Sequence, residues 1–157
     1  MLDLHVIELS WIATLHEAIR TPLLDDIVRY WDYFDSAEFL MVLVPAVWYL
    51  VGRKMGTRLF YLMIFSAFLN KGLKLLFGLP RPCHLWPDLG VMHYSSPGFP
   101  SGAAQTAAIL ASLIIMESKD KRLWALGLLF GLSLCFSRIY LGLHFPSDIL
   151  GGLVSGT

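Results

Sequence analysis

Three cations stand at the ends of apolar segments of this sequence, where a helix would leave a membrane. Lys74 and Arg81 follow one apolar run, and Arg138 ends another. A cation at membrane depth is unfavourable unless an anion lies beside it, and the neighbouring sequence offers too few acidic residues to neutralise all three. We therefore expect them to converge on a phosphate group, which the arginine guanidinium and the lysine ammonium both bind.

Two more groups are expected beside these cations. Ser101 and Gly102 begin an apolar helix, so backbone N–H groups and the positive end of the helix dipole would face an anion there. His144 and Asp148 open the last apolar segment, and their i, i+4 spacing keeps the two side chains close. The sequence thus predicts a phosphate cradle with a histidine and a carboxylate at its edge.

The composition indicates an integral membrane protein. Charged residues make up 15% of the 157 positions and hydrophobic residues 56%, whereas soluble domains carry roughly 25% charged residues. A soluble helical domain with an unusually apolar core is the alternative, but so short a chain has too much surface for so few charges. The net charge of zero and the lack of a basic, aromatic-rich block exclude nucleic acid as an expected partner.

The pattern of apolar and charged residues predicts an all-α fold, a membrane helical bundle of about five to six transmembrane helices preceded by amphipathic N-terminal helices. Residues 1–35 are expected to form interfacial helices, the first with an apolar face at Val6, Leu9, Ile12 and Ala13. Several of the predicted spans are shorter than about 20 residues, so tilt is expected. They cover residues 39–52, 59–73, 98–116, 123–137 and 148–157.

The sequence has no internal repeat and no change of composition that would divide it. Residues 1–157 are therefore expected to form one domain, with 36–157 as its transmembrane core. The last apolar segment is about half as long as a bilayer-spanning helix. We therefore expect the natural protein to continue beyond it.

The basic loops predict an orientation. Lysine and arginine cluster at 53–58 and again at 119–122, two spans later, and such loops are cytoplasmic under the positive-inside rule. Segments 78–100 and 138–147, which hold the polar residues above, would then emerge together on the opposite side. The prediction is a multi-pass cell-membrane protein with its site facing the periplasm or the exterior.

Three motifs in these segments resemble those of the type-2 phosphatidic acid phosphatases, a family that shares them with vanadium haloperoxidases. Each motif alone is moderately specific, but their order and spacing between Lys74 and Asp148 are highly specific together. The haloperoxidases are soluble, so the apolar character of this chain favours a lipid phosphate. The motifs are Lys74-x6-Arg81-Pro82, Pro100-Ser101-Gly102 and Ser137-Arg138-x5-His144-x3-Asp148.

The resemblance implies a membrane lipid phosphatase that uses neither a metal nor another cofactor and acts on a lipid monophosphate or diphosphate. His144 would attack phosphorus to form a phosphohistidine, Asp148 would orient its imidazole, and water would hydrolyse the phosphoenzyme. The groups that would hold the phosphoryl oxygens and stabilise the transition state are Lys74, Arg81, Ser101, Gly102 and Arg138.

One position departs from the family pattern. The residue after Pro-Ser-Gly is a histidine in the family, where it protonates the leaving oxygen, and here it is Ala103. Loss of a general acid slows a reaction by about 10²- to 10⁴-fold. His84, His93 and Tyr94 lie in the preceding loop and are candidate substitutes.

Three explanations of Ala103 stay open. The position was changed deliberately from histidine to trap a substrate, or the native enzyme hydrolyses lipid diphosphates, whose leaving group needs less protonation. In the third explanation the protein binds or transports lipid phosphates without turnover. Taken singly, Lys74 would be a snorkelling lysine and Arg138 an interfacial anchor, but the joint arrangement favours a phosphate site.

Overall fold

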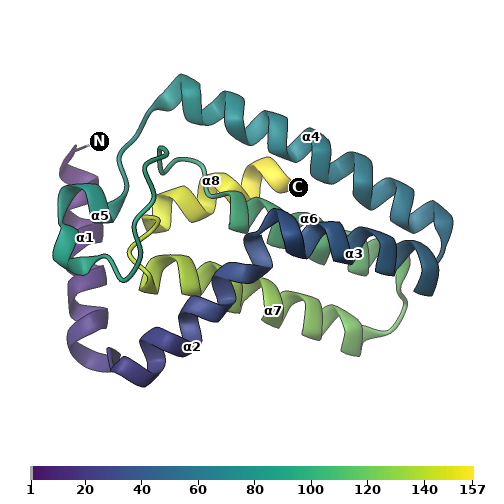
Figure 1. The fold of residues 1–157 in the computed structure, drawn as a ribbon, viewed down its shortest axis with the longest axis horizontal. Coiled ribbons are helices and arrows are strands. Elements are labelled where there is room, and N and C mark those ends of the chain that lie inside the picture. The colour runs from purple at the N-terminus through teal and green to yellow at the C-terminus, as the bar shows by residue number, and fades with distance from the viewer. Residues whose placement is uncertain (1) are drawn as a thin grey trace.

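The computed structural model describes residues 2–157, with side chains from Leu4 onward. Every regular element in this part of the chain is a helix, as predicted, and the helices form one bundle (Figure 1). The α-helices are α1 (Leu2–Ile19), α2 (Pro22–Asp32), α3 (Ala37–Leu50), α4 (Arg53–Phe77), α5 (Pro82–Leu85), α6 (Gly102–Glu117), α7 (Lys121–Tyr140) and α8 (Pro146–Gly156), and the 3-10 helices are η1 (Tyr33–Asp35) and η2 (Pro87–Leu89).

Helix α6 forms the centre of the bundle, because α4, α7 and α8 all pack against it. Its first turns carry small side chains, and Ala103, Ala104 and Ala107 are all buried. Small residues let neighbouring helices approach closely. The residues of α7 and α8 that complete this core cluster are Leu134, Cys135 and Ile149.

Helix α8 crosses the start of α6 at very short range. A side-chain carbon added at Gly152 would lie 2.4 Å from the carbonyl oxygen of Ser101, and one at Gly156 would lie 2.5 Å from that of Gln105. The backbone N–H of Ser101 also donates to the carbonyl of Asp148 at 3.0 Å. The starts of α6 and α8 are therefore joined directly through their main chains.

The long helix α4 ends at Gly78, whose φ of 56° is the left-handed conformation that favours glycine. The chain then folds back across the end of the bundle through α5 and η2. The N–H of Cys83 donates to the carbonyl of Gly142, and the N–H of Val91 to that of Leu141, both at 3.1 Å. Segments 78–100 and 138–147 thus lie together at one end, as the sequence predicts.

The predicted apolar face of the first helix is partly wrong. Leu9, Ile12 and Ala13 do pack in a core cluster, but Val6 is 66% exposed. The buried stripe of α1 also contains polar residues, because the helix covers the polar turn that precedes α8: its Glu8 accepts hydrogen bonds from the backbone and hydroxyl of Ser147. The polar members of this stripe are His5, Glu8 and His16.

Two helical stretches among the described residues are long and apolar enough to cross a membrane, Arg53–Leu85 and Lys121–Tyr140. A third span arises if Pro22–Asp35 and Ala37–Leu50, which meet at 59°, count as one broken segment. Gly102–Glu117 is apolar but shorter. Length and composition therefore identify two or three spans directly.

The close approach of α8 to α6 predicts that a methyl group added at Gly152 destabilises the protein. Gly152→Ala should lower stability by about 1–3 kcal/mol, because overpacking forces the helices apart. Gly72→Ala is the matched control, since a side-chain carbon at Gly72 meets nothing within 4 Å, and it should be neutral or slightly stabilising. Thermal unfolding in detergent measures both, and equal melting temperatures would contradict the close packing.

Candidate active site

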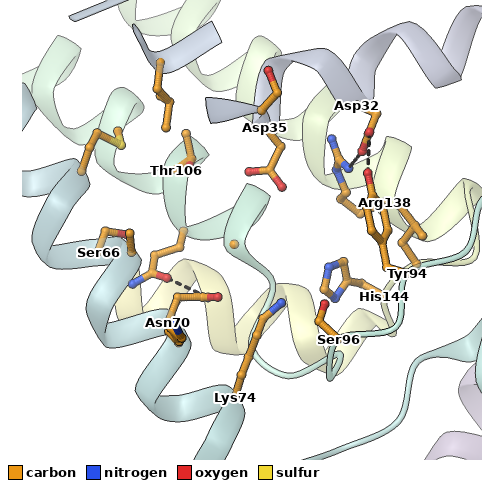
Figure 2. Close-up of a pocket in the computed structure, with 18 of the residues that line it drawn as sticks. Asp32, Asp35, Ser66, Asn70, Lys74, Tyr94, Ser96, Thr106, Arg138 and His144 are labelled. Atoms are coloured by element: carbon orange, nitrogen blue, oxygen red, sulfur yellow. Dashed lines mark hydrogen bonds and ion pairs between the residues drawn. The ribbon is translucent and has the colours of Figure 1, made fainter. Parts of the chain in front are cut away.

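A cavity of about 440 Å³ opens at the end of the bundle where the folded-back segments meet. Its wall is built by α2, η1, α3, α4, α6 and α7, by the loop that precedes α6 and by the turn between α7 and α8, so it brings together residues from most of the chain (Figure 2). Five of the predicted site residues line this cavity: Lys74, Arg81, Gly102, Arg138 and His144. The other three, Ser101, Ala103 and Asp148, lie behind the wall and are fully buried.

His144 is held between a carboxylate and a guanidinium. Its Nδ1 lies 3.4 Å from Oδ2 of Asp148, although the two groups are not aligned as a hydrogen bond. On the other side, Nη1 of Arg81 lies 3.1 Å from Nε2 of His144. A guanidinium can only donate, so Nε2 carries a lone pair and the proton of a neutral ring is on Nδ1, towards Asp148.

The surroundings keep His144 neutral. Burial holds the pKa of His144 well below its ordinary value of 6.5, and the charges of Arg81, Lys74 and Arg138 lower this pKa further. A neutral imidazole with its lone pair at Nε2 is a nucleophile at physiological pH once that lone pair is released from its donor. The predicted nucleophile therefore has the right protonation state and lies in the cavity wall.

Arg81 is anchored by several acceptors in addition to His144. Its Nε donates to the carbonyl of Ser96 at 2.7 Å and its Nη2 to the hydroxyl of Ser96 at 3.0 Å. Its Nη1 donates to the carbonyl of Leu143 at 2.9 Å. These bonds fix the guanidinium plane at the cavity wall, and the side chain is buried.

The prediction that too few acids lie near the cations is wrong for Arg138. Arg138, 2% exposed, forms an ion pair with Asp32 and donates to the carbonyl of Trp31. Asp32 also accepts a hydrogen bond of 2.6 Å from the hydroxyl of Tyr94. A second carboxylate, Asp35, lines the same cavity. The sequence interpretation missed both because helix α2 and η1 precede the motifs and read as an interfacial, amphipathic segment.

Ser101 serves the start of helix α6. Its hydroxyl accepts a bond of 3.4 Å from the backbone N–H of Ala104, which is the usual role of an N-cap serine, and the side chain is fully buried. Gly102 does line the cavity. The contribution of this turn to the cavity is therefore the backbone of the helix start and the small size of Gly102.

Ala103 does not face the cavity. It is fully buried in the core cluster with Leu134 and Ile149, and the side chains of Trp31 and Phe34 pack against that cluster. Of the candidate substitutes in the loop, Tyr94 lines the cavity, whereas His84 and His93 do not. His84 instead bonds to the carbonyl of Tyr94 at 2.6 Å.

Polar residues of α4 and α6 that the sequence interpretation did not single out complete the cavity wall. Asn70 donates to the carbonyl of Pro100 at 3.2 Å and to the side chain of Gln105 at 2.9 Å. Thr106 and Ser66 lie in the same part of the wall (Figure 2). These residues lie at helical spacing from Lys74 on α4 or from Gly102 on α6. That spacing is the one sequence pattern that would have revealed them.

A family model for the PAP2 superfamily matches residues 56–157, which include all the residues of the three motifs. The chain belongs to the PAP2 superfamily. The resemblance to type-2 phosphatidic acid phosphatases is thereby confirmed, and the relatives of the chain are phosphatases.

Two bacterial relatives and one solved structure illustrate the similarity. Phosphatidylglycerophosphatase B of Bacillus subtilis is 28% identical over 88% of this chain and 72% of its own length. Undecaprenyl-diphosphatase BcrC of the same species is 30% identical over 86% of this chain and 70% of its own. The crystal structure of LpxE from Aquifex aeolicus superposes with a TM-score of 0.83, at 26% identity over 94% of this chain and 88% of that one.

The chain also matches glucose-6-phosphatase catalytic subunits, of whose length it spans only about two fifths. The subunit from Bos taurus, for example, is 30% identical over 78% of this chain and 42% of its own length. The PAP2 superfamily members similar to this chain thus include phosphatases of lipid and of sugar phosphates, as their names state.

The ion pair between Arg138 and Asp32 predicts that removing the charge of Asp32 lowers the stability of the protein strongly. Asp32→Asn should lower stability by about 3 kcal/mol, because it leaves a buried guanidinium without its counter-charge. Asp26→Asn is the matched control, since its pair with Arg29 is exposed and 3.8 Å long, and it should change stability by less than about 0.5 kcal/mol. Chemical unfolding in detergent compares the two, and similar values would contradict the importance of the pair.

The protonation state of His144 can be measured directly. In histidine-labelled protein, the NMR signal of His144, assigned by its loss in His144→Ala, should titrate with a midpoint below pH 6.5. The sign follows from burial and from neighbouring cations, which both oppose the charged form, so the ring stays neutral until the pH falls below that midpoint. A midpoint at or above 6.5 would be inconsistent with this environment.

Proposed function

We propose that this protein is a membrane phosphatase that hydrolyses the phosphate monoester or diphosphate of a lipid through a phosphohistidine. One observation carries the proposal: the neutral His144 presents its Nε2 lone pair at the wall of a cavity that Lys74, Arg81 and Arg138 also line. A nucleophile among three cations is the arrangement that phosphoryl transfer requires.

In the proposed first step, phosphate enters the cavity and Arg81 turns its Nη1 hydrogen from His144 to a phosphoryl oxygen. The freed Nε2 lone pair forms a bond to phosphorus as the bond to the leaving oxygen breaks. Asp148 stabilises the imidazolium that develops, because its carboxylate lies beside Nδ1. In the second step, water attacks phosphorus and releases His144 and inorganic phosphate.

The other cations and the start of α6 bind the phosphoryl oxygens in this proposal. Lys74 reaches into the cavity from α4, and Arg138 lies at the opposite wall with one nitrogen engaged by Asp32 (Figure 2). The absence of a side chain at Gly102 lets an anion approach the backbone at the positive end of α6. Ser101 contributes indirectly, since its hydroxyl caps that helix.

The surroundings of the cavity favour a lipid as substrate. A second, apolar cavity of about 480 Å³ lies between α3, α4, α6 and α7. The two cavities are neighbours: Leu40 and Met63 line the first, whereas Phe39 and Leu59 line the second. The apolar cavity continues to Val51, so it follows α3 for about 18 Å. It would receive a lipid tail whose phosphate lies beside His144.

The membrane arrangement is part of the proposal. We infer five to six spans in one domain, with residues 36–157 as the transmembrane core and 1–35 as interfacial helices. The basic α3–α4 and α6–α7 connections lie at one end of the bundle, opposite α5 (Figure 1), and Arg58 pairs with Glu117 between them at 2.7 Å. The cavity is lined by Arg81, which directly precedes α5. With the end that holds the basic connections cytoplasmic, the cavity faces the periplasm or the exterior.

Phosphate release in detergent tests the proposed function. The unaltered protein should release phosphate from a long-chain alkyl monophosphate or diphosphate, and His144→Ala should abolish release, because the substitution removes the attacking nitrogen. His93→Ala is the matched control and should retain activity, since His93 does not line the cavity. Phosphate bound but never released by the unaltered protein would identify a binding or transport protein, and activity in His144→Ala would overturn the nucleophile.

A further inference from the structure

Hydrolysis of a lipid monophosphate needs a proton donor as well as a nucleophile. The leaving group is an alkoxide, a strong base, and protonating it as the bond breaks accelerates such reactions by about 10²- to 10⁴-fold. Position 103 cannot supply the proton, because Ala103 has no ionisable group and lies in the apolar core. The donor must therefore come from another element of the cavity wall.

Most of the ionisable groups in the cavity wall already have another role or a hydrogen-bond partner. Lys74, Arg81 and Arg138 bind phosphate in the proposed function, and Asp32 is engaged in its ion pair with Arg138. The hydroxyl of Tyr94 already donates to Asp32. Burial and that hydrogen bond raise the pKa of Tyr94 to about 12, which makes its hydroxyl a weak acid.

Lys71 lines the cavity as well but adds a further positive charge on exposed surface of α4. A further cation at the cavity adds to the attraction for phosphate, so Lys71 is grouped with the phosphate-binding residues. Among the ionisable residues that line the cavity, Asp35 remains as the donor.

Asp35 lies where a donor is needed. It is the last residue of η1, which contacts α6. Its neighbour Phe34 packs against the core cluster that contains Ala103, so the chain turns from that core to the cavity between residues 34 and 35. Figure 2 shows the carboxyl group of Asp35 pointing into the same space as Lys74 and His144.

The carboxyl group of Asp35 is also free. No cation among the residues that the structure describes lies within ion-pair distance of it, whereas Asp32 on the preceding turn is paired. Burial raises the pKa of Asp35 to about 6, and the charge of Asp32 contributes in the same direction, while the charges of Arg138, Lys74 and Arg81 act against it. A partly buried, unpaired carboxyl group in a catalytic cavity is suited to donate a proton.

We propose that Asp35 is the proton donor of this phosphatase, in place of a residue at position 103. The inference rests on the proposed function. As Nε2 of His144 bonds to phosphorus, the bond from phosphorus to the lipid oxygen breaks, and the Asp35 proton passes to that oxygen, so the lipid leaves as an alcohol. The Asp35 carboxylate then takes a proton from the water that attacks phosphorus, and the cycle closes.

The test compares two substrates with the same alkyl tail, a monophosphate and a diphosphate, in detergent. The leaving group of the diphosphate is an alkyl phosphate, which needs little protonation. Asp35→Asn should therefore slow hydrolysis of the monophosphate by about 10²- to 10⁴-fold but that of the diphosphate by less than about tenfold. Asp35→Glu should restore part of the monophosphate activity, because it returns a carboxyl group to the cavity.

A pH profile separates a donor from a structural residue. The kcat of the unaltered protein on the monophosphate should fall at high pH, as the donor loses its proton, and this fall should be absent in Asp35→Asn. Asp26→Asn, an exposed change on α2, is the matched control and should keep both the rate and the profile. Melting temperatures of all variants in detergent show that each is folded.

The outcomes distinguish this inference from the proposed function. Equal slowing on both substrates, an unchanged profile, or full activity of Asp35→Asn on the monophosphate would each overturn the role of Asp35, while phosphate release that depends on His144 would leave the proposed function standing. If the unaltered protein hydrolyses neither substrate, the proposed function itself fails and the role of Asp35 fails with it.

Discussion

The concentration of positive charge at one end of an apolar bundle is the constraint on which the rest of this structure depends. Arg81 and Arg138 are both buried, and a buried charge is tolerated only with hydrogen bonds and counter-charges around it. The chain meets this requirement from remote segments: Ser96 and Leu143 bind Arg81 through their carbonyl groups, and Asp32 binds Arg138 across 106 residues of sequence. The fold of the loops and of the N-terminal helices follows from this need.

The same requirement explains why the N-terminal helices belong to the site. Helix α2 brings Asp32 to Arg138 and Asp25 to the hydroxyl of Tyr140 at 2.7 Å. Helix α1 brings Glu8 to the start of α8, three residues after His144. These contacts close the end of the bundle around the cavity. The family model begins at residue 56, so these carboxylates lie outside the segment that it matches.

The sequence alone identified the residues whose chemistry depends on spacing. Lys74, Arg81, Arg138 and His144 meet at one cavity because motif order and span direction place them at the same end. Motif spacing did not predict the orientation of side chains. Ser101 and Ala103 belong to the second motif, yet Ser101 caps helix α6 and Ala103 packs in the core.

The sequence motifs also gave no indication of site residues that lie far from them in the chain. Acidic residues on an amphipathic helix are ordinarily solvated, and no pattern near Asp32 or Asp35 marks them as members of a site. Their place follows from η1, a single turn that redirects the chain between α2 and α3. Likewise, the buried stripe of α1 became polar because the helix covers the polar turn before α8.

Two helices, α6 and α8, begin beside the cavity. The protein places carboxylates at the start of α8 but not at the start of α6, and this difference affects where the site accepts negative charge. The start of α8 is occupied by carboxylates of the protein: Asp148 accepts from the N–H of Phe145 at 2.9 Å, and Glu8 from that of Ser147 at 2.7 Å. The start of α6 is capped only by a neutral hydroxyl. The protein thus satisfies the positive end of α8 with its own carboxylates and leaves that of α6 without an anion. In the proposed function, a phosphate would therefore bind on the α6 side of His144 and be repelled from the α8 side.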